Sequence, residues 1–223
     1  IVDNSPTPHD FKKVISHYHY IHLADNAGIA HAHNAGLIYL LKAGCEYGIL
    51  LDQDSSIPSD MVFNLSSLLN ASNKIKQNVV AIGPRIRCSF SDKKVSPRIQ
   101  QEVFEYDEWC WRARSMGFDI ARAKNVEMTH RLGDSRSKFV GITYKVGAPI
   151  RLYYQFRNIL LLSRRPYVPP YWKIRCLFFM PIRFFLNSIM QENRFERLGF
   201  MLKGIYDGLL GRKGTYNKHW QEK

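Results

Sequence analysis

Cysteine is scarce in this chain, and its scarcity argues against cysteine-based zinc sites and disulfide-stabilised folds. The 223 residues contain only 4 cysteines, which are scattered and form no Cys-x-x-Cys pair. This spacing argues against a zinc site and against a disulfide framework, and it favours reduced thiols in a cytosolic setting. No signal peptide is visible, but the chain opens without Met inside an expected strand, so this observation carries little weight.

Acidic residues are also few: Asp and Glu number 19 against 32 Lys and Arg, a formal net charge of +13. Such a charge attracts nucleic acid, anionic membranes or phosphorylated ligands. A nucleic-acid-binding protein is therefore one hypothesis, yet no helix-turn-helix, RNP or zinc pattern appears. The acidic turn at Asp52 and Asp54 would repel a phosphate backbone unless a metal intervened, so a metal-dependent nuclease stays open as an alternative.

The chain has no long, purely apolar run. Its most apolar C-terminal stretch, Leu177–Met190, contains Pro181 and Arg183, and is too short and polar for a confident transmembrane helix. Aromatic and basic residues between Tyr167 and Arg175, next to apolar helix, suit a membrane interface instead. The alternative for residues 151–223 is an ordinary helical subdomain or an oligomer contact, which leaves a homo-oligomer open.

The most informative stretch is Gly48–Ser55, where four largely apolar residues lead into Asp52 and Asp54. The apolar run predicts a buried strand of a parallel sheet. Alternate side chains of a strand point the same way, so both acids can face one point at the ligand-binding edge of the sheet. Carboxylates with substrate phosphates bind Mg²⁺ or Mn²⁺. Chance and an ordinary acidic turn are the simpler explanations of the pair.

Strands and helices alternate along residues 1–150, which predicts an α/β fold with a mostly parallel sheet. Ile1–Pro6 indicates a strand that ends in a turn at Asp3, where a carboxylate either caps the turn or accepts hydrogen bonds from a nucleoside. The residues alone favour the cap. Small residues precede a helix expected from Ile29 to about Ala43, with Gly44 as its stop.

Acids gather again at the start of a helix that Gly117 should end. Glu105, Asp107 and Glu108 are favoured there by the helix dipole, and any of them can serve as a general base. The strand Val126–His130 then ends at a histidine. A lone His is usually structural, but one at a strand end opposite an acidic turn suits a third metal ligand.

Seven short stretches in order resemble the bacterial rhamnosyltransferases of glycosyltransferase family 2, which have the GT-A fold. Together they span roughly residues 1 to 175: Val2–Ser5, Asn26–Ala30, Leu50–Ser55, Glu108–Ala113, His130–Ser135, Tyr153–Asn158 and Arg164–Tyr167. The resemblance implies a catalytic domain over 1–150, followed by a helical, basic and aromatic region over 151–223.

The resemblance also implies roles for single residues. Asp3 matches the acid that contacts the donor nucleoside, and Asp52 and Asp54 match the metal-binding DxD pair. His130 matches a further ligand of the Mg²⁺ or Mn²⁺ ion. The catalytic base of the family lies just before the Glu-Trp motif, which indicates Asp107.

Two departures from the family pattern bear on these roles. The first strand of the family and its loop are missing here, which makes an inactive sugar-nucleotide-binding homologue a further alternative. Where the family has Asp in Asp-x-Glu-Trp, this chain has Tyr106. Asp107 is therefore the first choice for the base and Glu105 the second, while Glu108 is assigned to the helix start.

The function that the resemblance implies is an inverting, metal-dependent transfer of a sugar, with rhamnose from dTDP-rhamnose as the family's suggestion. The acceptor would be a cell-surface polysaccharide or a lipid-linked glycan, and no nucleic acid would take part. The expected location is cytoplasmic, peripheral on the inner face of the bacterial cytoplasmic membrane.

Overall fold

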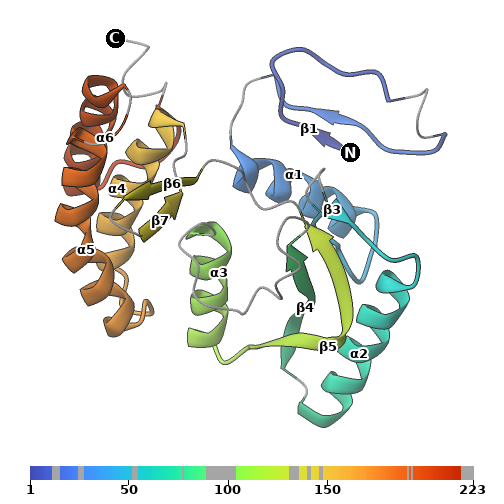
Figure 1. The fold of residues 1–223 in the computed structure, drawn as a ribbon. Coiled ribbons are helices and arrows are strands. Elements are labelled where there is room, and N and C mark those ends of the chain that lie inside the picture. The colour runs from blue at the N-terminus through green and yellow to red at the C-terminus, as the bar shows by residue number, and fades with distance from the viewer. Residues whose placement is uncertain are drawn as a thin grey trace. The chain divides into compact units, whose positions relative to one another are not determined.

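A computed structural model describes residues 1–11, 16–24, 28–51, 55–76, 78–88, 104–130, 136–139, 142–145, 148–189, 191 and 193–216. The chain divides into two compact units: Ile1–Gln53 together with Gly214–Lys223, and Asp54–Lys213 (Figure 1). The predicted functional boundary at residue 150 falls within the second unit, and the division of roles that it implies stays a prediction.

The first unit contains the helix that its small residues predict. This helix, α1 (Ile29–Lys42), ends two residues before Gly44, whose φ of 76° is one that glycine adopts without strain. It contacts β1 (Val2–Asp3), which pairs in parallel with β2 (Ile21–His22). The end of the expected first strand and the glycine stop of the helix are both confirmed.

The prediction of a buried strand at Gly48–Leu51 is wrong. Its apolar side chains from Ile49 to Leu51 are 41% to 45% exposed, and no strand runs through them. A strand needs a neighbour to satisfy its backbone N–H and C=O groups, and within the described ranges no strand pairs with this segment. The argument that strand alternation aims Asp52 and Asp54 at one point therefore loses its support.

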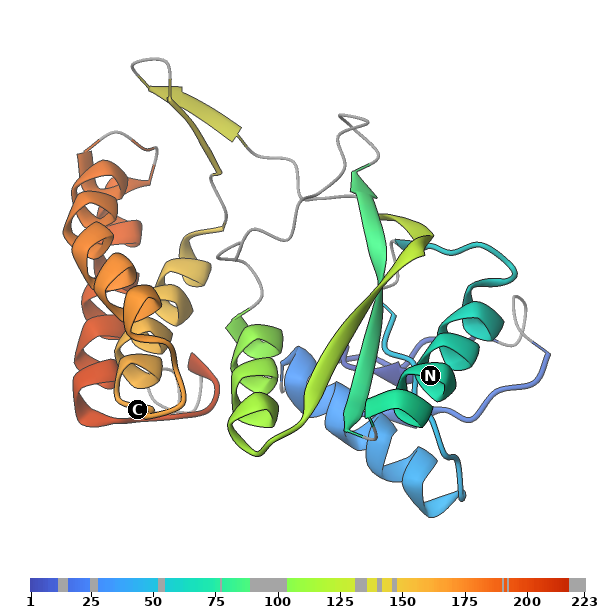
Figure 2. The same cartoon turned by 90° about the horizontal axis from the view of Figure 1, so that it is seen from below.

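The described sheet of the second unit has β5 (Asp119–His130) in the middle. β4 (Val79–Cys88) pairs with it in parallel, and β3 (Ser55–Ser56) pairs with it in antiparallel sense. α2 (Met61–Lys76) lies along β4 and β5 (Figures 1 and 2). The two long strands extend beyond the apolar runs that predict them, because each satisfies the backbone of the other through polar residues as well.

A small apolar core joins α2 to the sheet. Met61 of α2 is 1% exposed and packs with Ala123 and Val126 of β5. Asn73 ties the end of the helix to the start of β4: its Nδ2 donates to Val79 O at 3.1 Å, and its Oδ1 accepts from Val79 N at 2.9 Å. A helix packed on a partly parallel sheet is the arrangement of an α/β protein, as the sequence predicts.

The helix that carries the acidic cluster is α3 (Phe104–Ser115), and Gly117 follows it with a φ of 87°, as expected for a glycine stop. After β5 comes a hairpin of β6 (Arg136–Phe139) and β7 (Ile142–Lys145). The sequence patterns did not indicate this hairpin, because its strands are short and largely polar.

The C-terminal region is helical, as predicted. α4 (Pro149–Ser163), α5 (Pro170–Ile189) and α6 (Arg194–Leu210) pack against one another (Figure 2). α4 and α6 approach so closely that a Cβ added at Gly204 would lie 2.4 Å from the carbonyl oxygen of Tyr153. Glycine is therefore what allows these two backbones to touch. The fold as a whole is α/β with a helical C-terminal region, compatible with the GT-A expectation.

A buried polar cluster fixes how α6 sits on α4. Asp207 is 0% exposed and accepts a hydrogen bond from the Tyr153 hydroxyl at 2.7 Å and one from Arg212 Nη1 at 3.1 Å. Burial, followed by the hydrogen bond to Asp207, raises the pKa of Tyr153 to about 12. Loss of either partner would leave a buried carboxylate short of a hydrogen bond, so the cluster favours the observed register of α4 and α6.

Candidate functional site

Three chain segments meet where β4 and β5 end. Register pairs Cys88, the last residue of β4, with His130, the last residue of β5, and pairs His130 with Ser55 of β3. Residues directly opposite in an antiparallel pair have Cα atoms about 5 Å apart. The carboxyl ends of both parallel strands therefore lie beside the residue that follows Asp54 in the sequence.

This edge is the predicted metal site. Asp52 and Asp54 lie outside the described residues, and His130 is described by its backbone alone. Among the described residues, no group of three His, Cys, Asp or Glu side chains lies close enough to hold a metal ion. Asp52 and Asp54 are not among the described residues, so this finding does not test the predicted site. Two carboxylates and an imidazole are a donor set that fits Mn²⁺, or Mg²⁺ with water and phosphate oxygens.

The candidate bases lie in the first turn of α3, which contains both Glu105 and Asp107. Their side chains lie outside the described part of the structure, so the choice between them stays a prediction. The next acid, Glu108, has its partners: its Oε1 accepts from the Tyr167 hydroxyl at 2.5 Å and from Arg112 Nε at 3.1 Å. Burial and the nearby Glu108 carboxylate raise the pKa of Tyr167.

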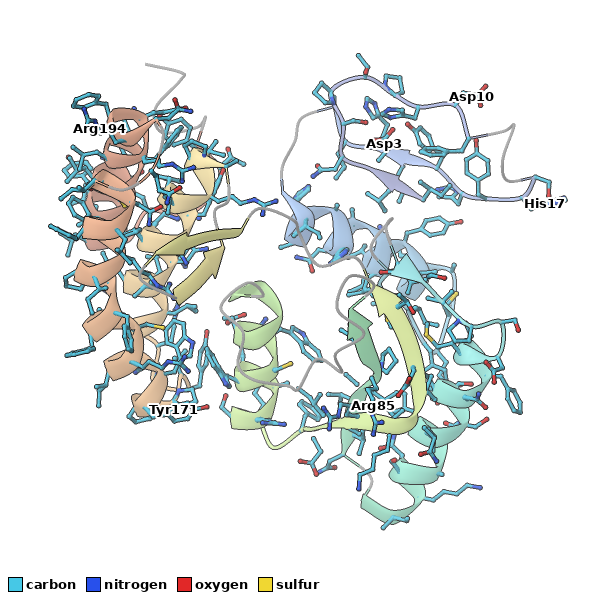
Figure 3. The ribbon with its side chains drawn as sticks, in the orientation of Figure 1. Asp3, Asp10, His17, Arg85, Tyr171 and Arg194 are labelled. Atoms are coloured by element: carbon cyan, nitrogen blue, oxygen red, sulfur yellow. The ribbon has the colours of Figure 1, made fainter. Side chains whose placement is uncertain are left out.

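Asp3 is 8% exposed and organises its own loop (Figure 3). Its Oδ1 accepts from the backbone N–H of Ser5 at 3.0 Å and from the Ser5 hydroxyl. Its Oδ2 accepts from the Tyr20 hydroxyl at 2.6 Å and from the backbone N–H of His9 at 3.0 Å. The Ser5 and Tyr20 hydroxyls hold the pKa of this carboxyl far below its usual range. Asp3 therefore caps the turn that follows β1, as the residues alone suggest, and its contact with a nucleoside stays a prediction.

Sequence reasoning missed the contacts that surround these acids. Nothing in the pattern joined Tyr20 to Asp3, or Tyr167 to Glu108 59 residues earlier. Tyr167 does belong to the Arg-Arg-Pro-Tyr stretch that carries part of the family resemblance. That membership was the available signal, but it says nothing about which residue Tyr167 contacts.

The outer side of α5 is apolar and exposed. Its large side chains recur every three or four residues, the spacing of one helix face. Tyr171 is 57% exposed (Figure 3), and the face continues with Ile174 at 70%, Phe178 at 67%, Ile182 at 46%, Phe185 at 60% and Ile189 at 56%. Arg175, also exposed, adds a cation beside this face. Among the described helices, none is long and apolar enough to cross a membrane.

Along 96% of its length the chain is similar to a dTDP-rhamnosyl transferase, RfbF of Shigella flexneri. The two are 29% identical over 256 residues, which cover 86% of the relative. No protein-family model and no solved structure matches the chain. The similarity confirms the resemblance to bacterial rhamnosyltransferases that the ordered motifs indicate, while membership of glycosyltransferase family 2 stays a prediction.

Proposed function

We propose that this protein is a glycosyltransferase that moves rhamnose from dTDP-rhamnose to a glycan acceptor. The observation that carries the proposal is the similarity, along 96% of the chain, to a protein named dTDP-rhamnosyl transferase. The acidic pair Asp52 and Asp54, and the acids in the first turn of α3, supply residue types that such a reaction needs.

In the proposed reaction a carboxylate of α3 takes the proton of an acceptor hydroxyl as the hydroxyl oxygen attacks the anomeric carbon of the donor sugar. Asp107 is the proposed base, with Glu105 as the second candidate. The bond from that carbon to the diphosphate breaks, and the nucleoside diphosphate leaves with the electron pair. One displacement suffices and no covalent enzyme intermediate is required, so the configuration at the anomeric carbon inverts.

Asp52, Asp54 and His130 are the residues that would hold Mg²⁺ or Mn²⁺ in this scheme. Support comes from the register, which places Ser55 opposite His130 at the ends of β4 and β5. Open α/β sheets bind ligands at this edge. A bound ion would neutralise charge on the departing diphosphate. Asp3 is the proposed contact for the donor nucleoside. To make that contact it would have to exchange one of its hydrogen bonds to Ser5, His9 and Tyr20 for one from the nucleoside.

We also propose that the α5 face docks on an anionic membrane, where a lipid-linked acceptor would be presented. An exposed row of large apolar side chains beside Arg175 suits a bilayer surface, in which the rings enter the interface and the cation meets lipid phosphates. The expected location is the inner face of the bacterial cytoplasmic membrane. A contact between two copies of the chain is the competing occupant of this face.

A donor screen tests the activity. The full chain is incubated with a panel of nucleotide sugars, with Mg²⁺ and with Mn²⁺, and products are followed by mass spectrometry. We expect dTDP-rhamnose to be consumed with release of dTDP. Donor binding without turnover would indicate an inactive sugar-nucleotide binder. Salt-dependent DNA binding without donor binding would instead indicate a nucleic-acid protein.

Vesicle co-sedimentation tests the docking. We expect the chain to pellet with anionic vesicles at low salt, and less with neutral vesicles or at high salt, because part of the attraction is electrostatic. Replacing both Phe178 and Phe185 with Ser should lower the partition coefficient more than tenfold, since burying each ring is worth about 2 kcal/mol.

The matched control for docking is Phe63→Ser, which removes a 72% exposed ring from α2 and should leave sedimentation unchanged. Substitution is preferable to truncation after α4, because Met201 of α6 is 0% exposed and packs on Phe156 of α4. If the α5 double variant and Phe63→Ser pellet equally, the α5 face does not bind membranes and serves packing instead. If only the α5 substitutions abolish self-association, the face binds a second copy of the chain.

A further inference from the structure

One face of α3 is fastened to the segment that joins α4 to α5. The hydroxyl of Tyr167, in that segment, donates to Glu108 Oε1 at 2.5 Å. Arg112 Nε donates to the same oxygen at 3.1 Å from one turn further along α3. The Glu108 side chain is 26% exposed, so solvent screens this hydrogen bond only in part and it restrains the helix.

An aromatic contact on the same face of α3 adds to this fastening. Trp111 packs against a core that includes Ile159 and Val168, both 0% exposed. Its ring meets Trp172 of α5 edge to face, with centroids 5.2 Å apart and planes at 68°, a favourable geometry for an aromatic pair. Glu108 and Trp111 are three residues apart, hence on one side of the helix. The polar and the aromatic contact therefore oppose rotation of α3 together.

This face adjoins the turn that carries the proposed base. Glu105 and Asp107 lie in the first turn of α3, just before Glu108. A helix moves as a rigid rod over one turn, so any roll or slide of α3 displaces both acids. Misplacing a catalytic group by about 1 Å costs on the order of 10²-fold in rate. The contact at Glu108 thus bears directly on where the base lies.

We propose that Tyr167 is a positioning residue for the transfer reaction: through Glu108 it fixes the rotation of α3 and so aims the carboxylate that accepts the proton. The inference rests on the proposed glycosyltransferase function and assigns Tyr167 a role within it. It also assigns Glu108 to orientation, not to proton transfer.

The same junction links the base to the proposed docking face. α5 begins at Pro170, three residues after Tyr167. Its Trp172 is 3% exposed and packs against Trp111. The exposed apolar row starts at the neighbouring Tyr171. One short helix end therefore holds α3 on its inner side and carries the proposed lipid-facing side chains on its outer side. A membrane that orients α5 would orient α3 with it.

The test is Tyr167→Phe in the full chain, which removes the hydroxyl and keeps the ring. We expect kcat for dTDP-rhamnose to fall about tenfold, the scale of a lost hydrogen bond to a charged group. Donor KM should stay within twofold, and the melting temperature should fall by only a few degrees. Tyr206→Phe is the matched control, because it removes the hydroxyl of a 50% exposed tyrosine on α6, and it should leave kcat unaltered.

Hydrogen exchange supplies a readout that does not depend on activity. In Tyr167→Phe, amides of 104–116 should exchange faster, whereas those of α4 and α6 should not change. Exchange in α3 equal to wild type would overturn the positioning role, as would an unaltered kcat in an active enzyme. An inactive wild type with the expected change in exchange would speak against the proposed function alone.

A double substitution separates positioning from proton transfer. If Tyr167 and Glu108 act through one hydrogen bond, Tyr167→Phe combined with Glu108→Gln should lose little more than the larger single loss. Glu108→Gln should also retain more activity than Glu108→Ala, because its amide oxygen can still accept from Tyr167. A loss of 10² or more in Glu108→Gln, with normal exchange in α3, would make Glu108 the base and overturn the inference.

Discussion

Asp54→Ala is expected to abolish metal-dependent donor binding and sugar transfer while the fold survives. The physical reason is that the proposed Asp54 ligand supplies an oxygen donor and a negative charge. A divalent ion needs both to stay bound beside a diphosphate. The fold should survive because the described cores of the second unit are built from apolar side chains of α2, β5 and the C-terminal helices. Calorimetric titration of dTDP-rhamnose with and without Mn²⁺ measures the effect.

Glu46→Ala is the control for that experiment, because it removes an exposed acid eight residues earlier and should leave both binding and transfer intact. Chelation of the metal from the wild-type protein should reproduce the Asp54→Ala defect. Full activity of the variant, or of the chelated enzyme, would remove Asp54 from the metal site and leave the acidic turn as a surface feature.

Asp107→Asn is expected to lower the transfer rate by a factor of about 10² or more with donor affinity nearly unchanged, the usual scale for loss of a general base. The amide keeps the shape of the side chain but cannot take the acceptor's proton. The measurement is kcat in steady state together with the donor dissociation constant by titration, which separates the chemical step from binding.

Glu105→Gln decides between the two acids of the first turn. If Glu105→Gln shows the large loss and Asp107→Asn does not, the Glu-Trp motif is misaligned by two residues and Glu105 is the base. Wild-type rates in both variants would contradict a base in this turn and direct attention to Glu108, whose partners in the structure are Tyr167 and Arg112.

Local chemistry made several elements predictable. Gly44 and Gly117 end helices because each adopts a positive φ that other residues reach only with strain, and both stops were expected. The carboxyl-terminal strand end at His130 was also expected, from Val126–His130, and the structure pairs it with Ser55 and Cys88. Glycine stops of helices are set by residues close in the chain, which is why the sequence predicts them.

Apolarity misled where pairing was required. Ile49–Leu51 has the composition of a buried strand, but within the described residues no neighbour accepts its backbone, and it remains exposed. In contrast, residues 119–122 at the start of β5 were not expected to form a strand. They do so because residues 79–83 of β4 pair with them. A strand is a property of two segments, so one segment's pattern cannot settle it.

The sequence by itself determined the α/β class, the helical C-terminal third, the glycine stops and the identity of the acids on which the proposed chemistry rests. Tertiary structure decided which distant groups meet: Tyr153 with Asp207 across 54 residues, and Tyr167 with Glu108 across 59. Propensity and capping act within a few residues of the chain. Hydrogen bonds between helices depend on where packing brings them, and close packing at Gly204 is a fact of three dimensions that no window of sequence contains.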